Sequence, residues 1–287
     1  MTIDTTNKIL TILYKREKEE GKLPLLLEFY RSLLETQVKA RKSTGILEPT
    51  ISAEAIQSRL LNGQPLVKFD ELALDWPLLR QVFVEVIAVF AKYPQLFGEI
   101  PTHLTKPGAG RLLTKKAVKA WFTGKTLPLS LLQDANENLI QTIIQSTLQP
   151  FLAGHAEALI GSIKKDSWHK NYCPICGGIP DIAYLEKEVG ERRLLCSRCD
   201  SDWQFHRMEC PYCRTVNQES LSFLADDQNL YRLYLCEKCK CYLKVIDLRK
   251  TDDEVLMPLE RIYTLDLDKQ ARDRGYHPYQ AEAIKNK

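Results

Sequence analysis

Four Cys-x-x-Cys pairs constrain this chain more than any other feature of its sequence. All nine cysteines lie between residues 173 and 241, and eight of them form these pairs. Such a turn places two thiolates at the separation that one tetrahedral metal ion requires, so two turns complete a four-sulfur site. The pairs are Cys173/Cys176, Cys196/Cys199, Cys210/Cys213 and Cys236/Cys239.

The gaps between the pairs indicate how they combine. Nineteen residues separate the first pair from the second, ten the second from the third, and 22 the third from the fourth. This long, short, long rhythm predicts two consecutive modules of one design, with the spacing of zinc ribbons or rubredoxins. We expect the modules at 166–207 and 208–250, with one metal ion each, and the spacing leaves iron and zinc equally possible.

Each module also has a characteristic order of elements. Short aromatic and β-branched runs between the pairs predict strands, so a module consists of a turn, a hairpin, a second turn and an exit strand. Gly177, just after the first pair, suits the positive φ that these turns demand. Asp200, Arg214 and Lys240 hold the equivalent places. The predicted strands are 182–185, 192–195, 203–205, 221–224, 230–235 and 242–248.

The first 172 residues contain no cysteine and have the apolar periodicity of helices. Pro101, Pro107 and three glycines predict a loop over 97–110, and Pro150 predicts a kink or a break. We therefore predict an α+β protein, with an all-helical domain over 1–165, the two modules, and a helical extension over 251–287. The expected helices are 8–20, one opened by Pro24, 52–61 capped by Ser52, one from Asp75 to Tyr93, 114–122 and 129–164.

The charge distribution bears on partners. Residues 1–165 carry 21 Lys and Arg against 16 Asp and Glu, whereas 166–287 carry 19 against 21. Four thiolates on a divalent ion add two negative charges per site, which makes the cysteine region a poor binder of phosphate backbones. A basic run with Trp121 and Phe122 is better interpreted as the solvated face of an amphipathic helix than as a nucleic-acid patch. Its basic residues are Arg111, Lys115, Lys116, Lys119 and Lys125.

Several observations address the cellular compartment. The sequence has no apolar run near the roughly 20 residues of a membrane span, and residues 1–6 lack the pattern of a signal peptide. We therefore expect a cytoplasmic protein without membrane insertion. In a reducing compartment, paired Cys-x-x-Cys turns favour metal ligation over disulfides.

The cysteine region resembles a known family. The segments Trp168-His-Lys-Asn-Tyr-Cys-Pro-Ile-Cys-Gly-Gly-Ile-Pro180, Leu195-Cys-Ser-Arg-Cys199 and Cys210-Pro-Tyr-Cys213 are similar to those of the FdhE family, the formate dehydrogenase accessory proteins. So is Cys236-Glu-Lys-Cys239 followed by Tyr242-Leu-Lys244. Residues 27–37 resemble that family's early helix, and residues 265–268 with 275–278 resemble its carboxy-terminal end.

This resemblance implies a helper protein that acts on the catalytic subunit of formate dehydrogenase and is not itself an enzyme. It also favours iron over zinc in the two rubredoxin-like modules. The sequence accordingly shows no phosphate-binding Gly-rich loop and no local catalytic motif. A tandem zinc-ribbon nucleic-acid reader and a small electron-transfer protein are the alternatives. Cys241, outside the four pairs, is interpreted as a bystander. His169 and His206 lie near cysteine pairs and are interpreted as residues at the surface or around the ligands, since eight well-spaced thiols are already present.

Overall fold

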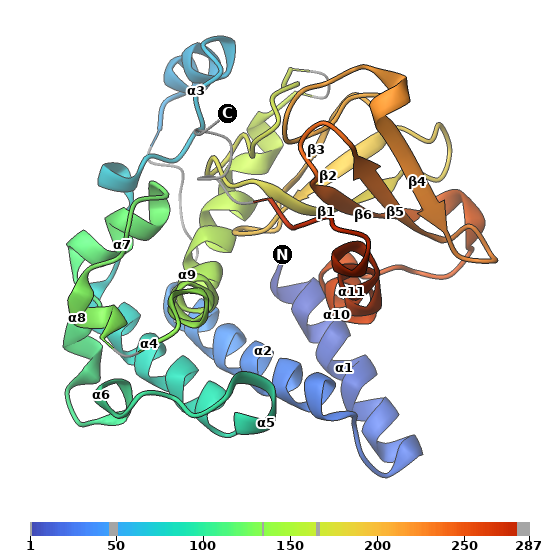
Figure 1. The fold of residues 1–287 in the computed structure, drawn as a ribbon. Helices are drawn as coiled ribbons and strands as arrows, with labels where there is room; N and C mark the ends of the chain where they lie inside the picture. The colour runs from blue at the N-terminus through green and yellow to red at the C-terminus, as the bar shows by residue number, and fades with distance from the viewer. Residues whose placement is uncertain (1, 46–50, 134, 165–166, 280–287) are drawn as a thin grey trace. The chain divides into compact units, whose positions relative to one another are not determined.

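The computed structural model describes residues 2–45, 51–133, 135–164 and 167–279. The chain divides into two compact units (Figure 1). Unit 1 comprises Met1–Glu48 and Val67–His155, and unit 2 comprises Pro49–Leu66 and Ala156–Lys287. The boundary predicted at residue 165 lies outside the described residues, as do residues 280–287 of the predicted extension. Within the described ranges, no helix combines the length and apolar character needed to cross a membrane.

Unit 1 is helical, as predicted. Its core joins α2 to α4 through aromatic side chains, with the rings of Phe29 and Phe90 meeting edge to face at 5.0 Å. The predicted cap of α4 is confirmed, because the Leu78 N–H donates to Asp75 Oδ1 over 3.0 Å. The helices are α1 (Ile3–Glu20), α2 (Leu25–Ser43), α4 (Trp76–Ala91), α5 (Pro94–Phe97), α6 (Thr102–Thr105), α7 (Lys115–Phe122), α8 (Leu129–Leu132) and α9 (Glu137–Leu159), with short 3-10 turns at Phe69–Glu71 and Ala109–Leu112. The last four residues of α9 belong to unit 2.

Three predictions about unit 1 need correction. The first helix starts five residues early, because Thr2 caps it by accepting from the Thr5 N–H. The expected 97–110 loop contains α6 and the start of a 3-10 turn. The long C-terminal helical segment is broken at Gln133, whose φ is 31°, and α9 continues through Pro150.

A buried side chain explains why Pro150 does not break α9. Proline has no N–H, so the carbonyl of Ser146, four residues earlier, loses its helical donor. Gln37 of α2 is buried and donates from Nε2 to that carbonyl over 2.8 Å. The orphaned acceptor is thus satisfied without water, and the helix persists.

The basic helix α7 is amphipathic, as interpreted from the sequence. Val118 and Trp121 are buried, whereas Lys119 lies at the surface and binds Asp70 with Nζ 2.8 Å from Oδ2. Lys119, one of the basic residues of this run, is therefore one partner of an exposed ion pair. Thr114 caps the helix by accepting from the Ala117 N–H.

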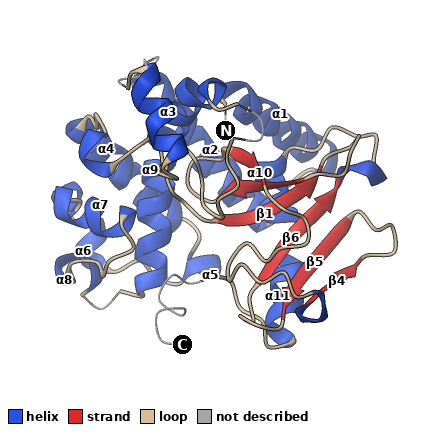
Figure 2. Ribbon diagram, turned by 90° about the horizontal axis from the view of Figure 1, so that it is seen from above, coloured by secondary structure: helices blue, strands red, loops and turns tan. Residues whose placement is uncertain are grey.

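Unit 2 contains one six-stranded sheet with the order β3-β2-β1-β6-β5-β4. Figure 2 shows strands of this sheet in red, with β1, β6, β5 and β4 labelled. Each module contributes three antiparallel strands, and the two halves join where β1 pairs in parallel with β6. All six predicted strands are present within two residues of their expected ends. They are β1 (Pro180–Leu185), β2 (Arg192–Cys196), β3 (Asp202–Gln204), β4 (Leu221–Ala225), β5 (Tyr231–Cys236) and β6 (Tyr242–Asp247).

The C-terminal helices of unit 2 pack on one face of this sheet. Ala271 of α11 (Leu265–Asp273) and Tyr276 join Leu233 and Tyr242 in one apolar cluster. A second cluster joins Ile182, Leu195 and Ile246, and Met257 of α10 (Met257–Tyr263) packs against it. These cluster residues occupy every second position of their strands, so the residues between them point to the face of the sheet that these helices do not cover. The predicted α+β class, with helices first, then the sheet-rich cysteine region and a helical end, is confirmed.

Unit 2 also includes a segment from much earlier in the chain. α3 (Ala53–Leu61) has the predicted Ser52 cap, and residues 62–66 follow it to the first cysteine turn. The Leu66 N–H donates to the Pro174 carbonyl over 2.8 Å, and the Tyr172 hydroxyl donates to the Gly63 carbonyl over 2.6 Å. This segment therefore supports the first pair of cysteines.

Candidate metal centres

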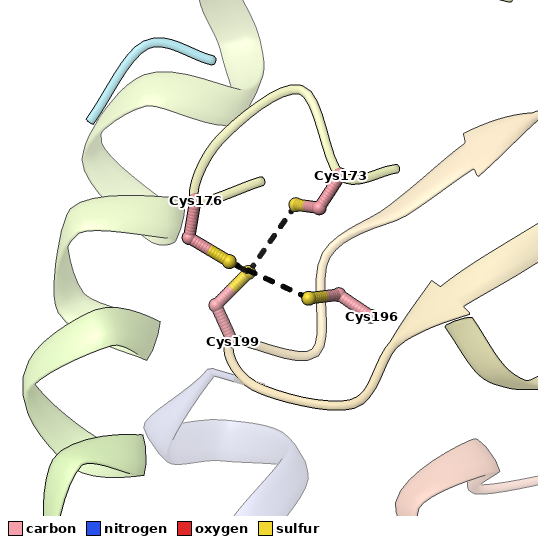
Figure 3. A group of neighbouring side chains, drawn as sticks. All are labelled: Cys173, Cys176, Cys196 and Cys199. Atoms are coloured by element: carbon pink, nitrogen blue, oxygen red, sulfur yellow. Dashed lines mark hydrogen bonds between the residues drawn. The ribbon is translucent and has the colours of Figure 1, made fainter. Parts of the chain in front are cut away.

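The structure gathers the eight paired cysteines into two groups of four. Within each group the Sγ atoms all lie within 4.8 Å of one another. Figure 3 shows the sulfurs of the first group pointing toward a common centre, with two from each of two loops. The grouping is the one that the sequence spacing predicts. Group 1 contains Cys173, Cys176, Cys196 and Cys199, and group 2 contains Cys210, Cys213, Cys236 and Cys239.

All four cysteine turns share one backbone conformation. We call each Cys-x-x-Cys turn with the two residues after it a knuckle, numbered 1 to 4 along the chain: 173–178, 196–201, 210–215 and 236–241. In each, the first cysteine's N–H donates to the carbonyl of the sixth residue, and the fifth residue's N–H donates to the first cysteine's carbonyl. The fifth residues all have positive φ, at 70° for Gly177, 59° for Asp200, 61° for Arg214 and 54° for Lys240.

The positive φ predicted for Gly177 is thus confirmed, and the three residues at the equivalent places share it. Only Gly177 adopts it without the strain that a side chain brings to this region. Non-glycine residues stay there because the two backbone hydrogen bonds of the knuckle hold them. The knuckles with a non-glycine fifth residue therefore carry local backbone strain, and in this conformation each knuckle directs two sulfurs toward one centre.

The sulfur geometry fits a four-coordinate ion. The Cys173 and Cys199 sulfurs are 3.5 Å apart, and those of Cys210 and Cys239 are 3.7 Å apart. Metal–sulfur bonds of 2.3 Å in a regular tetrahedron require sulfurs about 3.8 Å apart, whereas a disulfide requires about 2.05 Å. Backbone N–H groups also point at sulfur, including Ile175 toward Cys173 at 3.3 Å.

The chemistry of the donor set also calls for a cation. Burial raises the pKa of the Cys173 thiol well above its usual value, and that of Cys196 likewise. Four buried sulfurs this close are stable as thiolates only around a positive ion. The residues therefore fit a divalent or trivalent metal, and they would supply four thiolate ligands at each centre.

The two centres differ in exposure. All four cysteines of group 1 are buried, whereas Cys213 and Cys239 of group 2 are partly exposed. Arg261 of α10 further encloses group 1, because its guanidinium donates to the Cys196 carbonyl over 2.8 Å and binds Asp181 and Asp200. Burial alone would lower the pKa of Arg261, but these two carboxylates raise it above its usual value.

Cys241 takes the sixth position of knuckle 4, where the other knuckles have Gly178, Ser201 and Thr215. It is buried, and its Sγ lies 3.6 Å from the Cys239 carbonyl and 3.7 Å from His277 Nδ1. Neither metal group includes it. The other three knuckles also have small residues at this position, so a cysteine fits there.

The histidines near the cysteines do not join either group among the described residues. The rings of His169 and His206 stack at 5.4 Å instead. Sequence reasoning missed two supports of the first centre, the 62–66 segment and Arg261. No local motif marks them, because both meet the knuckles through long-range contacts.

Comparisons of sequence and of structure both relate this chain to FdhE proteins. No family model matches it. An FdhE homologue of Aquifex aeolicus is 28% identical over 256 residues, which cover 88% of this chain and 85% of that protein. FdhE of Escherichia coli K12 is 28% identical over 109 residues, covering 37% of this chain and 35% of that protein. The resemblance stated from the cysteine region is thus confirmed.

The fold is also that of a solved structure. The crystal structure of the FdhE protein from Pseudomonas aeruginosa matches with a TM-score of 0.62 at 19% identity. The match covers 99% of this chain and 96% of that one. At this identity, the likeness concerns the fold.

Proposed function

We propose that this chain, a homologue of the FdhE proteins, is an accessory protein that binds the catalytic subunit of formate dehydrogenase and promotes formation of the active enzyme. The observation that carries the proposal is the pair of four-cysteine centres in a chain that is similar to the FdhE homologue of Aquifex aeolicus over 88% of its length. We place its action in the cytoplasm, where reducing conditions keep thiols available for metal.

A helper role rather than catalysis agrees with the composition of the two centres. All four donors at each centre are protein thiolates, so a bound ion has no open position for water or substrate. Such a closed site either stabilises a module or, with iron, exchanges one electron. We propose iron at both centres, on the strength of the family resemblance.

The direct test is co-purification with a tagged formate dehydrogenase catalytic subunit. Wild-type protein should be retained, and the Cys173→Ser/Cys176→Ser variant should lose most of this retention because its first centre is dismantled. Cys241→Ser is the matched control, since it alters a cysteine outside both groups. Undiminished formate dehydrogenase activity in a strain that lacks this protein would refute the accessory role.

The identity of the metal has a separate test. Protein purified without air should contain two ions per chain and show the sulfur-to-iron charge-transfer bands of a rubredoxin-type site. A colourless protein with two zinc ions would rule out iron at these centres and with it a redox role of the metal. It would not contradict the proposed accessory role. Phosphate-backbone binding is disfavoured by the acidic excess of residues 166–287.

A further inference from the structure

Knuckle 3 supplies Cys210 and Cys213 to the second centre, yet side chains of the first module hold it in place. The first module, residues 166–207, contains both knuckles of the first centre, and knuckle 3 begins at residue 210. Side-chain contacts with the first module occur at three positions, which are residues 209, 212 and 214. These contacts connect the two centres.

Arg192 of β2 makes the first of these contacts. Its side chain is buried, and its guanidinium donates to the backbone carbonyls of His206 and Glu209. Glu209 is the residue directly before Cys210. Hydrogen bonds from a charged donor are stronger than those between neutral groups, so β2 of the first module fixes the chain where it enters knuckle 3.

Tyr212 makes the second contact from within the knuckle. Its N–H points at Cys210 Sγ over 3.5 Å, and its buried hydroxyl donates to the Pro180 carbonyl of β1 over 3.3 Å. Pro180 lies opposite Cys196, a ligand of the first centre. Tyr212 therefore contacts a ligand of the second centre and also a strand residue that is paired with a ligand of the first.

Arg214, the fifth residue of knuckle 3, makes the third contact. Its guanidinium donates to the His169 carbonyl over 3.3 Å and lies over the Phe205 ring at 5.4 Å. Both partners belong to the first module. Because Arg214 has a positive φ, these contacts help to hold a residue whose backbone is strained.

Knuckle 4, which supplies the other two ligands of the second centre, is held by other parts of the chain. The Glu237 N–H donates to the Ser220 carbonyl of the second module. The His277 N–H, in the C-terminal segment, donates to the Lys240 carbonyl. The pairing of β6 with β1 begins at Lys244, beyond the end of knuckle 4. The second centre therefore combines one knuckle positioned by the first module with one positioned by its own module and the C-terminal segment.

We propose that knuckle 3 couples the two centres, so that an ion at the first centre raises the affinity of the second, with Arg192 and Tyr212 as the positioning residues. The first module is too small to fold firmly without its ion, so filling the first centre orders β1 and β2. Arg192 and Pro180 then lie where knuckle 3 requires them, and less of the chain remains to be ordered when the second ion binds. By linkage, an ion at the second centre raises the affinity of the first by the same factor.

The inference stands on the geometry of unit 2 and depends neither on the proposed function nor on which metal is bound. The pairing of β1 with β6 also joins the modules and contributes a part of the coupling that does not pass through knuckle 3. Loss of the contacts to knuckle 3 should therefore reduce the coupling without abolishing it.

The test measures the coupling with Co²⁺ as the probe, on the reduced full chain without air. Titration against a chelator such as nitrilotriacetate gives the binding constants, which are read from the cobalt–thiolate absorption. Cys173→Ser/Cys176→Ser leaves only the second centre, and Cys236→Ser/Cys239→Ser leaves only the first while keeping knuckle 3. The coupling factor is the product of the two association constants of the intact chain divided by the product of the two single-centre constants. We expect a factor of about ten or more.

Two neighbouring arginines of β2 provide the matched comparison. Arg192→Met removes the donor to the Glu209 carbonyl and should lower the coupling factor at least about fivefold, whereas Arg192→Lys keeps a charged donor and should restore part of it. Arg193 binds Glu186 and Asp202, which lie in the first module itself. Arg193→Met should therefore change the factor less than about twofold. Each variant is measured with both centres and with either centre alone, so effects on one centre cancel.

A second pair of variants makes a milder change and decides the question where an arginine variant fails to fold. Tyr212→Phe removes only the hydroxyl that reaches β1, and it should lower the coupling factor about threefold. Tyr184→Phe removes a hydroxyl that donates to Asp202 within the first module, and it should leave the factor unchanged. Far-UV circular dichroism of the metal-filled chains establishes which variants fold.

Three results would overturn the proposal. They are a coupling factor near one in the wild type, equal factors in the wild type and Tyr212→Phe, and equal losses in folded Arg192→Met and Arg193→Met. A factor that stays undiminished in both Tyr212→Phe and Arg192→Met would assign the coupling to the pairing of β1 with β6 alone.

Discussion

Replacing Gly178 with alanine should empty the first centre while leaving the second filled. Gly178 is the sixth residue of knuckle 1, and its carbonyl accepts from the Cys173 N–H over 2.7 Å. A Cβ at this position would lie 2.8 Å from Cys196 Sγ and 3.0 Å from Arg198 Cδ. The other knuckles carry Ser201, Thr215 and Cys241 at the same position and therefore already accommodate a Cβ.

The size of the effect follows from these distances. Ordinary van der Waals contact begins at 3.4 Å, so the sulfur or the turn has to move by about 0.6 Å. Metal–ligand distances tolerate deviations of only about 0.2 Å. The arginine side chain can swing aside, but Cys196 Sγ is buried among the other ligands and cannot. The displacement is about three times the tolerance of the site.

Elemental analysis after reconstitution with excess metal provides the assay. Wild type should contain two ions per chain, and Gly178→Ala should contain one. Ser201→Ala and Cys241→Ala are controls at equivalent positions, and both should retain two. If Gly178→Ala also retained two ions, with an unchanged visible spectrum after cobalt substitution, our account of knuckle 1 would be wrong.

Three further predictions follow from individual contacts. A chelator such as EDTA should remove the ions in two phases of equal amplitude, the faster from the second centre, whose Cys213 and Cys239 are partly exposed; Cys213→Ser should eliminate the fast phase, and a single phase in the wild type would contradict this order. Gln37→Leu should lower the free energy of unfolding by about 1–3 kcal/mol, because the buried Ser146 carbonyl loses its donor. In a Pro150→Ala background, the restored N–H should reduce this loss, and equal losses in urea titrations of both backgrounds would refute the explanation. Burial, aided by Arg41, lowers the pKa of His155, so the unfolded chain binds its proton first; stability should fall as pH drops below about 6.5, and His155→Gln should flatten that part of the profile.

Much of unit 2 was predictable because its information is local. A Cys-x-x-Cys turn needs only six residues to form its hydrogen bonds, and the positive φ at Gly177 follows from that turn alone. Short aromatic and β-branched runs mark the strands between the knuckles and the exit strand that follows the last one. Grouping the cysteines required only the lengths of three gaps.

The remaining features depend on residues far apart in sequence. Pro150 predicts a kink or a break in the helix, whereas α9 is continuous there and Gln37, a residue of α2, supplies the donor that the Ser146 carbonyl would otherwise lack. The support of knuckle 1 by Leu66 likewise depends on a segment about 100 residues away, across a loop whose closure leaves no pattern in the sequence. Nothing in the spacing predicts that the two modules share one sheet either.

That shared sheet has a consequence for the two centres. The parallel pairing of β1 with β6 builds an apolar cluster from Ile182 and Leu195 of the first module and Ile246 of the second. Each module has too few residues for a sufficient core of its own, so the free energy of binding each ion is largely folding free energy of this common structure. An ion at one centre therefore stabilises the strands that position the other. By linkage, loss of the first ion lowers the affinity for the second, even where excess metal keeps that site filled.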